Sequence, residues 1–230
     1  MAVTPTAAAP DAARTAGRDR TAETAICRRV GGAGRGGRTS PRRQQILAAA
    51  AALFARRGFH GVSVDDLGAA AGVSGPALYR HFRSKEAILA ELLVGVSERL
   101  LGGGRLRVQG AADPGAALAA LVEWHVEFAL DNADVISVQT RDLASLPDPE
   151  RRRVRALQQR YVGVWADVVA GVTGCDPETA VAAAHATFGL INSTPHSARL
   201  PRHEMAALLR AMAVAAAGAT VSTARSGRGS

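Results

Sequence analysis

The sequence predicts an all-α protein with a small three-helix unit near its N-terminus and a larger bundle of helices behind it. Between the apparent helix starts, apolar residues recur at i, i+3, i+4 and i+7, the spacing of one helix face, and no segment alternates convincingly as a β-strand does. Four helix starts are marked by a capping residue followed by proline, which suits the first helical turn: Ser40-Pro41, Asp113-Pro114, Asp148-Pro149 and Asp176-Pro177.

Length and composition limit the class of protein. The 230 residues suit one compact domain or two unequal ones, and 47% hydrophobic residues support a sizeable core. The two cysteines, Cys27 and Cys175, give neither a disulfide framework nor a cysteine-based metal site. We find no signal-peptide core near the N-terminus. The most apolar stretch, residues 205–221, contains Arg210 and many small residues, so it does not indicate a membrane span. These features favour a cytoplasmic protein.

The positive charge is concentrated at one end of the chain. The net charge of +8 divides into +4 for residues 1–39, +4 for residues 40–86 and zero for residues 87–230. A basic end joined to a neutral body suggests a polyanionic partner at that end. The alternative, a solvated basic tail without a partner, is equally open on composition alone.

The elements follow in order from the capping residues and the apolar spacing. Residues 1–39 lack hydrophobic periodicity and predict a disordered basic tail, with a second disordered tail at 221–230. Three serines are further candidate caps, and Ser63 has Asp66 three positions on, as in a capping box. Gly102 to Gly104 should break the chain as a hinge or loop. Ser63, Ser74 and Ser84 are the candidate caps of the second, third and fourth helices. We predict helices at about 41–57, 63–70, 74–80, 84–101, 113–130, 132–145, 148–172, 176–193 and 202–219.

The segment from Ser63 to Lys85 has the pattern of two short helices joined by a tight turn. Gly72 stands at the turn, where glycine permits a positive φ that other residues resist. The helix at 41–57 would supply the third wall of a small core. This is the arrangement of a helix-turn-helix, whose second helix enters the major groove of DNA. The side chains buried between the crossing helices should be Leu67, Ala71, Val73 and Leu78.

Residues 42–90 contain a further series of short motifs. They are Ile46, Leu47, Ala49, Ala50, Leu53 and Phe54, then Gly58-Phe59, Ser63-Val64-Asp65-Asp66-Leu67, Ala70-Ala71-Gly72-Val73-Ser74, Leu78-Tyr79-Arg80-His81-Phe82 and Ser84-Lys85-Glu86. In these motifs the segment resembles the DNA-binding domain of the TetR family of transcriptional regulators. One departure is Gly68, where the family usually carries alanine. We expect it to cost about 1 kcal/mol of helix propensity and to make the domain slightly less stable.

The chemistry of these residues suggests their roles on DNA. Ser63 at a helix N-terminus, together with Tyr79, His81 and Lys85, should bind phosphates and position the protein. Arg80 is the best candidate for reading a base, because its guanidinium matches guanine O6 and N7. The alternatives are a core aromatic for Tyr79 and a solvated charge for Arg80. The predicted DNA-binding residues are Arg42, Ser63, Ser74, Gly75, Pro76, Ala77, Tyr79, Arg80, His81 and Lys85.

Residues 87–220 resemble TetR-type ligand-binding and dimerisation domains in the number and order of their helices. The resemblance implies that the last two long helices, 176–193 and 202–219, pair with those of a second copy as a homodimer. The alternative for the residues on these helices is ordinary core within one chain. The interface would involve Phe188, Ile191, Met205, Leu208, Leu209 and Met212.

An effector pocket is expected among helices 113–130, 132–145, 148–172 and 176–193. Such a pocket needs an apolar wall with a few polar groups. Two alternatives stay open: a structural ion pair between Arg141 and Asp142, and a satisfied core histidine at His125. The candidate pocket residues are Trp124, His125, Phe128, Gln139, Arg141, Tyr161, Trp165, Phe188 and Asn192.

Residues 139–146, 151–165 and 188–196 resemble actinobacterial TetR-type regulators of fatty-acid or acyl-CoA metabolism, which implies a fatty acid or an acyl-CoA as effector. The arginines at 151–153 and 155 could then bind the phosphates of coenzyme A. The alternative for them is a solvated helix start, since cations near a helix N-terminus are unfavourable unless an anion joins them.

Together these features predict a ligand-responsive repressor that binds double-stranded operator DNA as a dimer. A helical DNA-binding dimer without an effector, or a transcriptional activator, remains open. The enzyme class is disfavoured, because no Ser/His/Asp order, paired-carboxylate signature, metal-spaced histidines or phosphate loop emerges. We therefore expect no catalytic residues, no metal and no cofactor.

Overall fold

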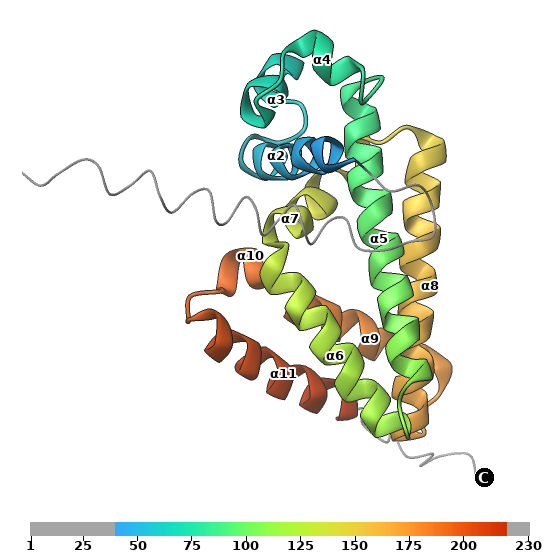
Figure 1. Ribbon diagram of the computed structural model, residues 1–230. Coiled ribbons are helices and arrows are strands. Elements are labelled where there is room, and N and C mark those ends of the chain that lie inside the picture. The colour runs from blue at the N-terminus through green and yellow to red at the C-terminus, as the bar shows by residue number, and fades with distance from the viewer. Residues whose placement is uncertain (1–39, 220–230) are drawn as a thin grey trace, which may run out of the picture.

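The computed structural model describes residues 40–219, and this part of the chain is helical and contains no strand (Figure 1). The two tails predicted at 1–39 and 221–230 lie outside the described residues. The all-α prediction is confirmed. In chain order the elements are α2 (Pro41–Arg57), α3 (Val64–Ala71), α4 (Gly75–Tyr79), α5 (Lys85–Gln109), α6 (Pro114–Asp131), α7 (Ala133–Asp142), the 3-10 turn η2 (Leu143–Ser145), α8 (Asp148–Thr173), α9 (Pro177–Ile191), α10 (Thr194–Ser197) and α11 (Arg202–Gly218).

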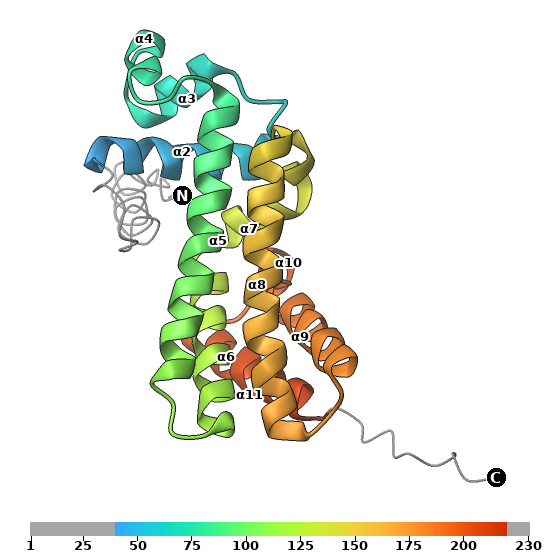
Figure 2. The same cartoon turned by 90° about the vertical axis from the view of Figure 1, so that its right-hand side faces the viewer.

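The helices form a head and a longer body. Helices α2, α3 and α4 gather at one end as the head (Figure 1). The long helices α5 and α8 run side by side from the head down the body (Figure 2). Helices α6, α9 and α11 pack around their far half, and α7 lies against α2 where the body meets the head. The body therefore contacts the head directly through α7 as well as through the start of α5.

Most helices begin at their predicted caps. In each case a side-chain oxygen accepts a hydrogen bond from the backbone N–H three residues on, which satisfies a donor that the helix leaves unpaired. The exception is Asp148, which is the first residue of α8 behind Pro147 and pairs with Arg151 instead. The confirmed caps are Ser40, Ser63, Ser74, Ser84, Asp113 and Asp176.

The turn of the helix-turn-helix depends on two glycines. Gly72 adopts the left-handed conformation with φ 63°, as predicted. Gly68 faces the turn so closely that a Cβ there would lie 2.8 Å from the carbonyl oxygen of Val73. Glycine lowers the helix propensity at position 68, but it allows the close approach of the turn. Alanine would not fit this backbone without a shift. Beneath the turn, Leu67 and Leu78 are fully buried, as predicted, whereas Ala71 and Val73 are only half-buried.

Helix α5 does not end at the three glycines, which corrects the predicted break after residue 101. It continues through Gly102, Gly103 and Gly104 to Gln109. A Cβ at Gly103 would overlap the ring of Trp124 on α6, and a Cβ at Gly104 would lie 2.6 Å from Cε2 of Tyr161 on α8. The glycines therefore let two large aromatic side chains pack against the backbone of α5, and this packing outweighs their poor helix propensity.

Candidate DNA-binding head and effector cavity

The exposed face of the head is formed by α4 and the residues just after it. Ser74, Pro76 and Arg80 are exposed, and Tyr79 retains 54% of its surface. Within residues 40–219, the side chains of Tyr79 and Arg80 make no hydrogen bond or ion pair. The alternative of a core role for Tyr79 is therefore wrong. The remaining predicted residues of this face, Gly75, Ala77 and His81, are half-buried.

Ser63 does not offer its hydroxyl to a ligand, which corrects its predicted role. The Oγ atom accepts a bond from the backbone N–H of Asp66 at 3.0 Å and donates to the carboxylate of Asp66 at 2.7 Å. The same carboxylate accepts from the backbone N–H of Ser63 at 2.9 Å, which completes a capping box. These bonds hold the pKa of Asp66 below its ordinary value, so a negative charge stands at this helix start.

Lys85 likewise faces inward rather than toward a ligand. Its ammonium donates to the carbonyl oxygens of Phe59 and Val62 at 2.9 and 2.8 Å, and it lies 4.3 Å from the centroid of the Phe59 ring. Two of its three donors are thus occupied by the loop that precedes α3. The compact ammonium fixes this loop to the start of α5, so a direct phosphate contact by Lys85 is not supported.

Two arginines of α2, Arg42 and Arg43, stabilise the head by bonding to residues outside their own helix. Arg42 remains exposed, but it donates to the carbonyl of Gly72 at 2.6 Å and to the Gln45 side chain at 2.9 Å. Arg43 pairs with Glu91 of α5, donates to the carbonyl of His81 and lies 4.0 Å from the centroid of the Phe82 ring. Arg43 was not predicted from the sequence, because its partners are distant along the chain and no local motif marks them.

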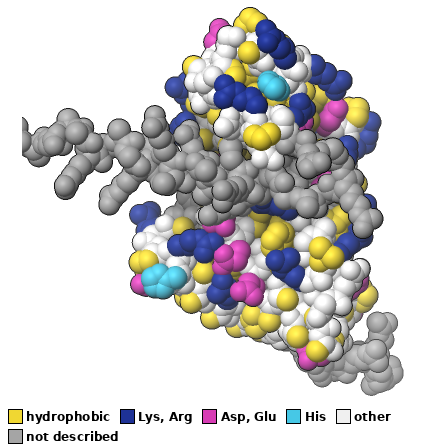
Figure 3. Space-filling model, viewed as in Figure 1, with side chains coloured by type: hydrophobic (Ala, Val, Ile, Leu, Met, Phe, Trp, Pro, Cys, Tyr) yellow, Lys and Arg dark blue, Asp and Glu magenta, His cyan; other side chains and the backbone are white. Residues whose placement is uncertain are grey.

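The surface of the head carries the positive charge expected of a polyanion-binding unit. Residues 40–86 have a net charge of +4. In Figure 3, lysine and arginine side chains are spread over the head, with few acidic groups between them. A surface of this kind attracts the phosphate backbone of DNA at long range.

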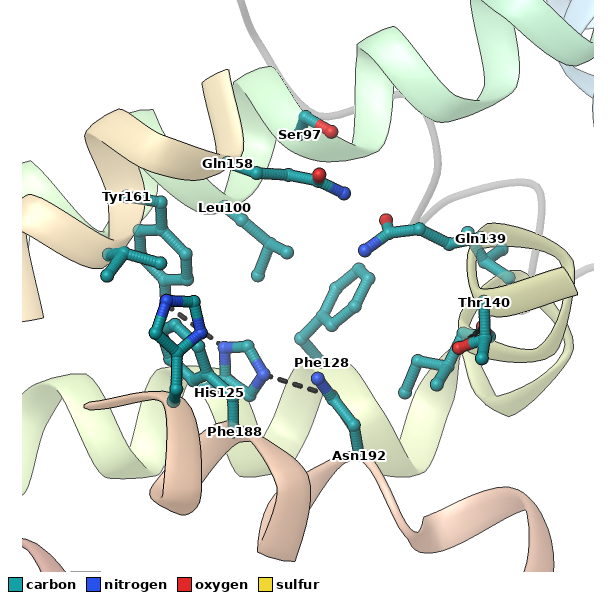
Figure 4. Close-up of a pocket in the computed structure, with 14 residues that line it drawn as sticks. Ser97, Leu100, His125, Phe128, Gln139, Thr140, Gln158, Tyr161, Phe188 and Asn192 are labelled. Carbon is teal, nitrogen blue, oxygen red and sulfur yellow. Dashed lines mark hydrogen bonds between the residues drawn. The ribbon is translucent and has the colours of Figure 1, made fainter. Parts of the chain in front are cut away.

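The body contains a cavity of about 280 Å³ between α5, α6, α7, α8 and α9 (Figure 4). Six of the predicted pocket residues line it: His125, Phe128, Gln139, Tyr161, Phe188 and Asn192. Eight further lining residues were not predicted: two lie on α5, which was not expected to border the pocket, and six lie on predicted helices whose inward-facing side the sequence does not fix. The missed residues are Ser97, Leu100, Val135, Ile136, Thr140, Gln158, Val162 and His185.

Three predicted pocket residues do not line the cavity. Trp165 is fully buried behind it, with its ring centroid 5.0 Å from that of Phe188. Trp124 covers the glycines of α5, and its Nε1 donates to a backbone carbonyl at 3.3 Å. Arg141 points out of the body and donates to the carbonyls of Phe54 and Ala55 at the end of α2. Arg141 also pairs with Asp142 at 3.0 Å, so the alternative of a structural ion pair is correct.

His125 organises the polar end of the cavity. Its Nε2 lies 3.1 Å from Oδ1 of Asn192, and its Nδ1 lies 3.2 Å from the hydroxyl of Tyr161. Because Oδ1 can only accept, Nε2 carries the proton and Nδ1 accepts from Tyr161. Burial lowers the pKa of His125 to about 4 and raises the pKa of Tyr161 above its ordinary value, so both side chains are neutral at pH 7.

The predicted dimer interface is only partly available on the surface. Ile191, Met205 and Leu209 are at most 5% exposed and belong to the core of the chain, which corrects their predicted role. Phe188 faces the cavity. On α11, Leu208 and Met212 remain 43% and 46% exposed, and on α9 Val181 remains 39% exposed.

Two other kinds of site are absent from residues 40–219. No group of three or more histidine, cysteine, aspartate or glutamate side chains in this range is placed to hold a metal ion. None of its helices combines the length and the apolar character needed to cross a membrane.

Comparison with known families and structures agrees with this arrangement. Residues 46–92 match the family described as bacterial regulatory proteins, tetR family, and residues 111–196 match a tetracyclin repressor-like C-terminal domain. A TetR-family transcriptional regulator from Bordetella parapertussis 12822 is 26% identical and superimposes with a TM-score of 0.68 over 76% of this chain and 93% of that one.

Several curated relatives carry the name HTH-type transcriptional repressor KstR2. The relative from Rhodococcus jostii (strain RHA1) is 34% identical over 58% of this chain and 66% of its own length. The relative from Mycobacterium tuberculosis (strain CDC 1551 / Oshkosh) is 36% identical over 58% of this chain and 67% of its own length. The matches thus span about two thirds of each relative. Both parts of the helical architecture, and not the helix-turn-helix alone, are therefore matched, and the chain belongs to the TetR family of transcriptional regulators.

Proposed function

We propose that this regulator is a repressor that binds operator DNA as a homodimer and leaves the operator when a small hydrophobic effector fills the cavity. The observation that carries the proposal is the exposed face of α4, where Arg80 and Tyr79 stand without partners in the described chain on a head of net charge +4. The relatives named KstR2 are repressors by name, which favours repression over activation.

On DNA, the exposed residues divide into reading and positioning groups. Arg80 would bond a guanine edge in the major groove, and Tyr79 and Ser74 would donate hydroxyl bonds to phosphates on either side. Ser63 and Lys85 are left out of this set, since their polar groups are held by the capping box and by the loop before α3. The two would act indirectly, by keeping α3 and α4 in place.

Dimerisation would use the outer faces of α9 and α11, which pack together on one side of the body. The partly exposed Val181, Leu208 and Met212 lie there among alanines, and small side chains allow helices to approach closely. Two copies joined in this way would present two α4 helices to successive major grooves of a near-palindromic operator.

Release by the effector would pass through α7. This helix contributes Gln139 and Thr140 to the cavity, and its next residue, Arg141, holds the carbonyl groups at the end of α2. A ligand that displaces α7 would therefore move α2 and change the spacing of the two heads. The cavity also favours a sensor over a DNA-binding dimer without an effector, since a purely structural bundle would be packed.

Binding of a coenzyme A headgroup by the arginines at 151–153 and 155 is less well supported by the structure than by the sequence. Arg151 pairs with Asp148, and Arg153 pairs with Glu98 at 2.6 Å, so two of the proposed phosphate-binding arginines already have partners. Arg152 and Arg155 remain exposed. The proposal therefore requires a hydrophobic effector, whether or not a coenzyme A group is attached to it.

The test is a band-shift assay with the full-length protein on the DNA upstream of its own gene and on random duplex of equal length. We expect preferred binding to the upstream fragment, with affinity that falls as salt rises. Arg80→Ala should reduce this preference by about tenfold or more. The control is Arg105→Ala on α5, an exposed arginine far from α4, which should bind as the wild type does.

A second arm of the same assay tests the dimer. The double variant Leu208→Glu, Met212→Glu should sediment as a monomer and lose the operator band, whereas Val172→Glu at the far end of α8 should do neither. Equal affinity of the wild type for upstream and random DNA, together with a monomeric wild type, would refute the proposed function.

A further inference from the structure

Within residues 40–219, the wall of the cavity contains no carboxylate, ammonium or guanidinium group, and the imidazole of His185, which also lines it, is exposed to solvent. Arg99 lies over the ring of Phe128, 5.1 Å from its centroid, but it is not a lining residue. A carboxylate buried here would lose its hydration without gaining a counter-ion, which is costly. The part of the effector that enters the cavity should therefore be neutral.

Most polar side chains of the wall already have partners. The hydroxyl groups of Ser97 and Thr140 donate to backbone carbonyls of their own helices, at 2.8 and 2.9 Å. His125 bonds to the hydroxyl of Tyr161 and to Oδ1 of Asn192. Each of these five side chains thus has at least one polar atom bonded within the wall, and the amide nitrogen of Asn192 keeps donors for which the described residues supply no partner.

Gln139 and Gln158 are different. Neither side chain makes a hydrogen bond within the described residues, and both are half-buried. They come from opposite walls, Gln139 from α7 and Gln158 from α8, and in Figure 4 their amide groups extend toward one another across the cavity. Each amide can donate two hydrogen bonds and accept two. Polar groups in this position lack partners unless water or a ligand supplies them.

We propose that Gln139 and Gln158 together bind a neutral oxygen-bearing group of the effector, such as an amide, ester, ketone or hydroxyl, while its apolar part lies against Leu100, Phe128 and Phe188. This inference rests on the proposed function, in which the occupant of the cavity is the effector. The cavity of about 280 Å³ is slightly smaller than usual ligand sites, which are about 300–1,000 Å³. The occupant is therefore a small molecule or the small end of a larger one.

The position of the two glutamines also links binding to regulation. An effector that bonds both amides joins α7 to α8 across the cavity. Gln139 is two residues from Arg141, which bonds to the end of α2. The bonds from the effector to Gln139 would therefore also shift the contact between α7 and α2. The hydrogen bonds to the neutral group would thus both recognise the effector and displace α7.

The experiment compares octanamide with octanoate, which have the same size and shape but differ in charge. Binding to the full-length wild type is followed at pH 7.5 by calorimetry and by tryptophan fluorescence, to which Trp165, in edge contact with Phe188, contributes together with Trp124. We expect octanamide to bind at least about tenfold more tightly than octanoate, because only the anion leaves a buried charge unpaired.

Variants assign the effect to the two glutamines. The pair Gln139→Leu, Gln158→Leu should weaken octanamide about tenfold or more, whereas Gln159→Leu, a matched change at an exposed neighbour outside the cavity, should not. Gln158→Lys should reverse the preference in favour of octanoate, because it places a counter-ion in the wall.

Three outcomes would overturn the inference: octanoate binding as tightly as octanamide, the double leucine variant retaining wild-type affinity for octanamide, or no saturable binding of either probe. Operator binding is measured on the same preparations without any probe. A protein that binds its operator but shows one of these outcomes refutes the neutral-group inference alone, whereas loss of operator preference in the wild type refutes the proposed function.

Discussion

At the scale of single residues, His125 shows how burial determines the chemistry of a side chain. Its ring stacks on Phe188 with centroids 4.8 Å apart and meets the edge of Trp165 at 5.9 Å. These apolar neighbours disfavour the imidazolium ion, while Asn192 and Tyr161 fix the neutral tautomer. The sequence placed His125 in the pocket, but only the packing around it makes the side chain a neutral hydrogen-bonding group.

The low pKa of His125 predicts a loss of stability in weak acid. The pKa is about 4 in the folded chain and near 6.5 when the chain is unfolded. As the pH falls from 6.5 to 4, the unfolded chain binds a proton that the folded chain does not, so the free energy of unfolding falls. The loss between pH 7 and pH 5 should be about 2 kcal/mol from this group, measured by urea denaturation at both values.

His125→Phe should reduce the difference in unfolding free energy between the two pH values by this amount, although the variant is less stable at pH 7 because Asn192 and Tyr161 lose their partner. His203→Gln is the matched control, because the side chain of His203 is 83% exposed, and it should keep the wild-type pH dependence. If His125→Phe kept the full pH dependence as well, the buried neutral imidazole would not be its source.

At the scale of elements, the course of α5 is decided by its neighbours rather than by its own residues. Three consecutive glycines suggest a break, yet the helix continues for the 25 residues from Lys85 to Gln109. The rings of Trp124 and Tyr161 occupy the space that side chains at Gly103 and Gly104 would need. Gly102 has nothing within 4 Å of its ideal Cβ position, so it makes no such contact.

This difference predicts opposite effects of the same substitution at nearby positions. Gly102→Ala should raise the free energy of unfolding by about 0.5–1 kcal/mol, since alanine is the better helix former and the space is open. Gly104→Ala should lower it by about 1–3 kcal/mol, because the added methyl group presses on Tyr161. Urea denaturation of the two variants beside the wild type measures both, and a gain of equal size at the two positions would contradict the packing argument.

At the scale of the whole molecule, the contact between α7 and α2 joins the DNA-binding head to the body that holds the cavity. Arg141 bonds both carboxylate oxygens of Asp142 at 3.1 and 3.0 Å and donates to the carbonyls of Phe54 and Ala55. The Asp142 carboxylate is only 6% exposed, so it orients the guanidinium from within the protein. One side chain therefore caps the end of α2 from the next domain.

Removing this side chain should loosen the head without unfolding the body. Arg141→Met keeps an apolar stem but loses the bonds to α2 and leaves Asp142 without its partner. We expect faster hydrogen exchange at the end of α2 and in residues 58–62, with exchange in α9 and α11 unchanged. Arg105→Met on α5 is the control. Unaltered exchange at the end of α2 would show that Arg141 does not hold the head to the body.

Much of the fold follows from local signals in the sequence. Ser40, Ser84, Asp113 and Asp176 each mark a helix start, because a cap needs only the backbone donors three residues on. The turn at Gly72 is equally local, since a positive φ is a property of one residue. Six residues of the cavity were also found, because aromatic and amide side chains on adjacent helices commonly form ligand sites.

The tertiary structure alone decided where long side chains point and which space is left empty. Tyr161 and Trp165 lie one turn apart on α8, yet only Tyr161 reaches the cavity. Lys85 faces the loop before α3 rather than the solvent, and Arg141 reaches α2. Caps and turns depend on backbone groups within four residues, which the sequence specifies directly. The direction of a side chain and the volume of a cavity depend instead on helices distant in sequence, and only their packing in space determines them.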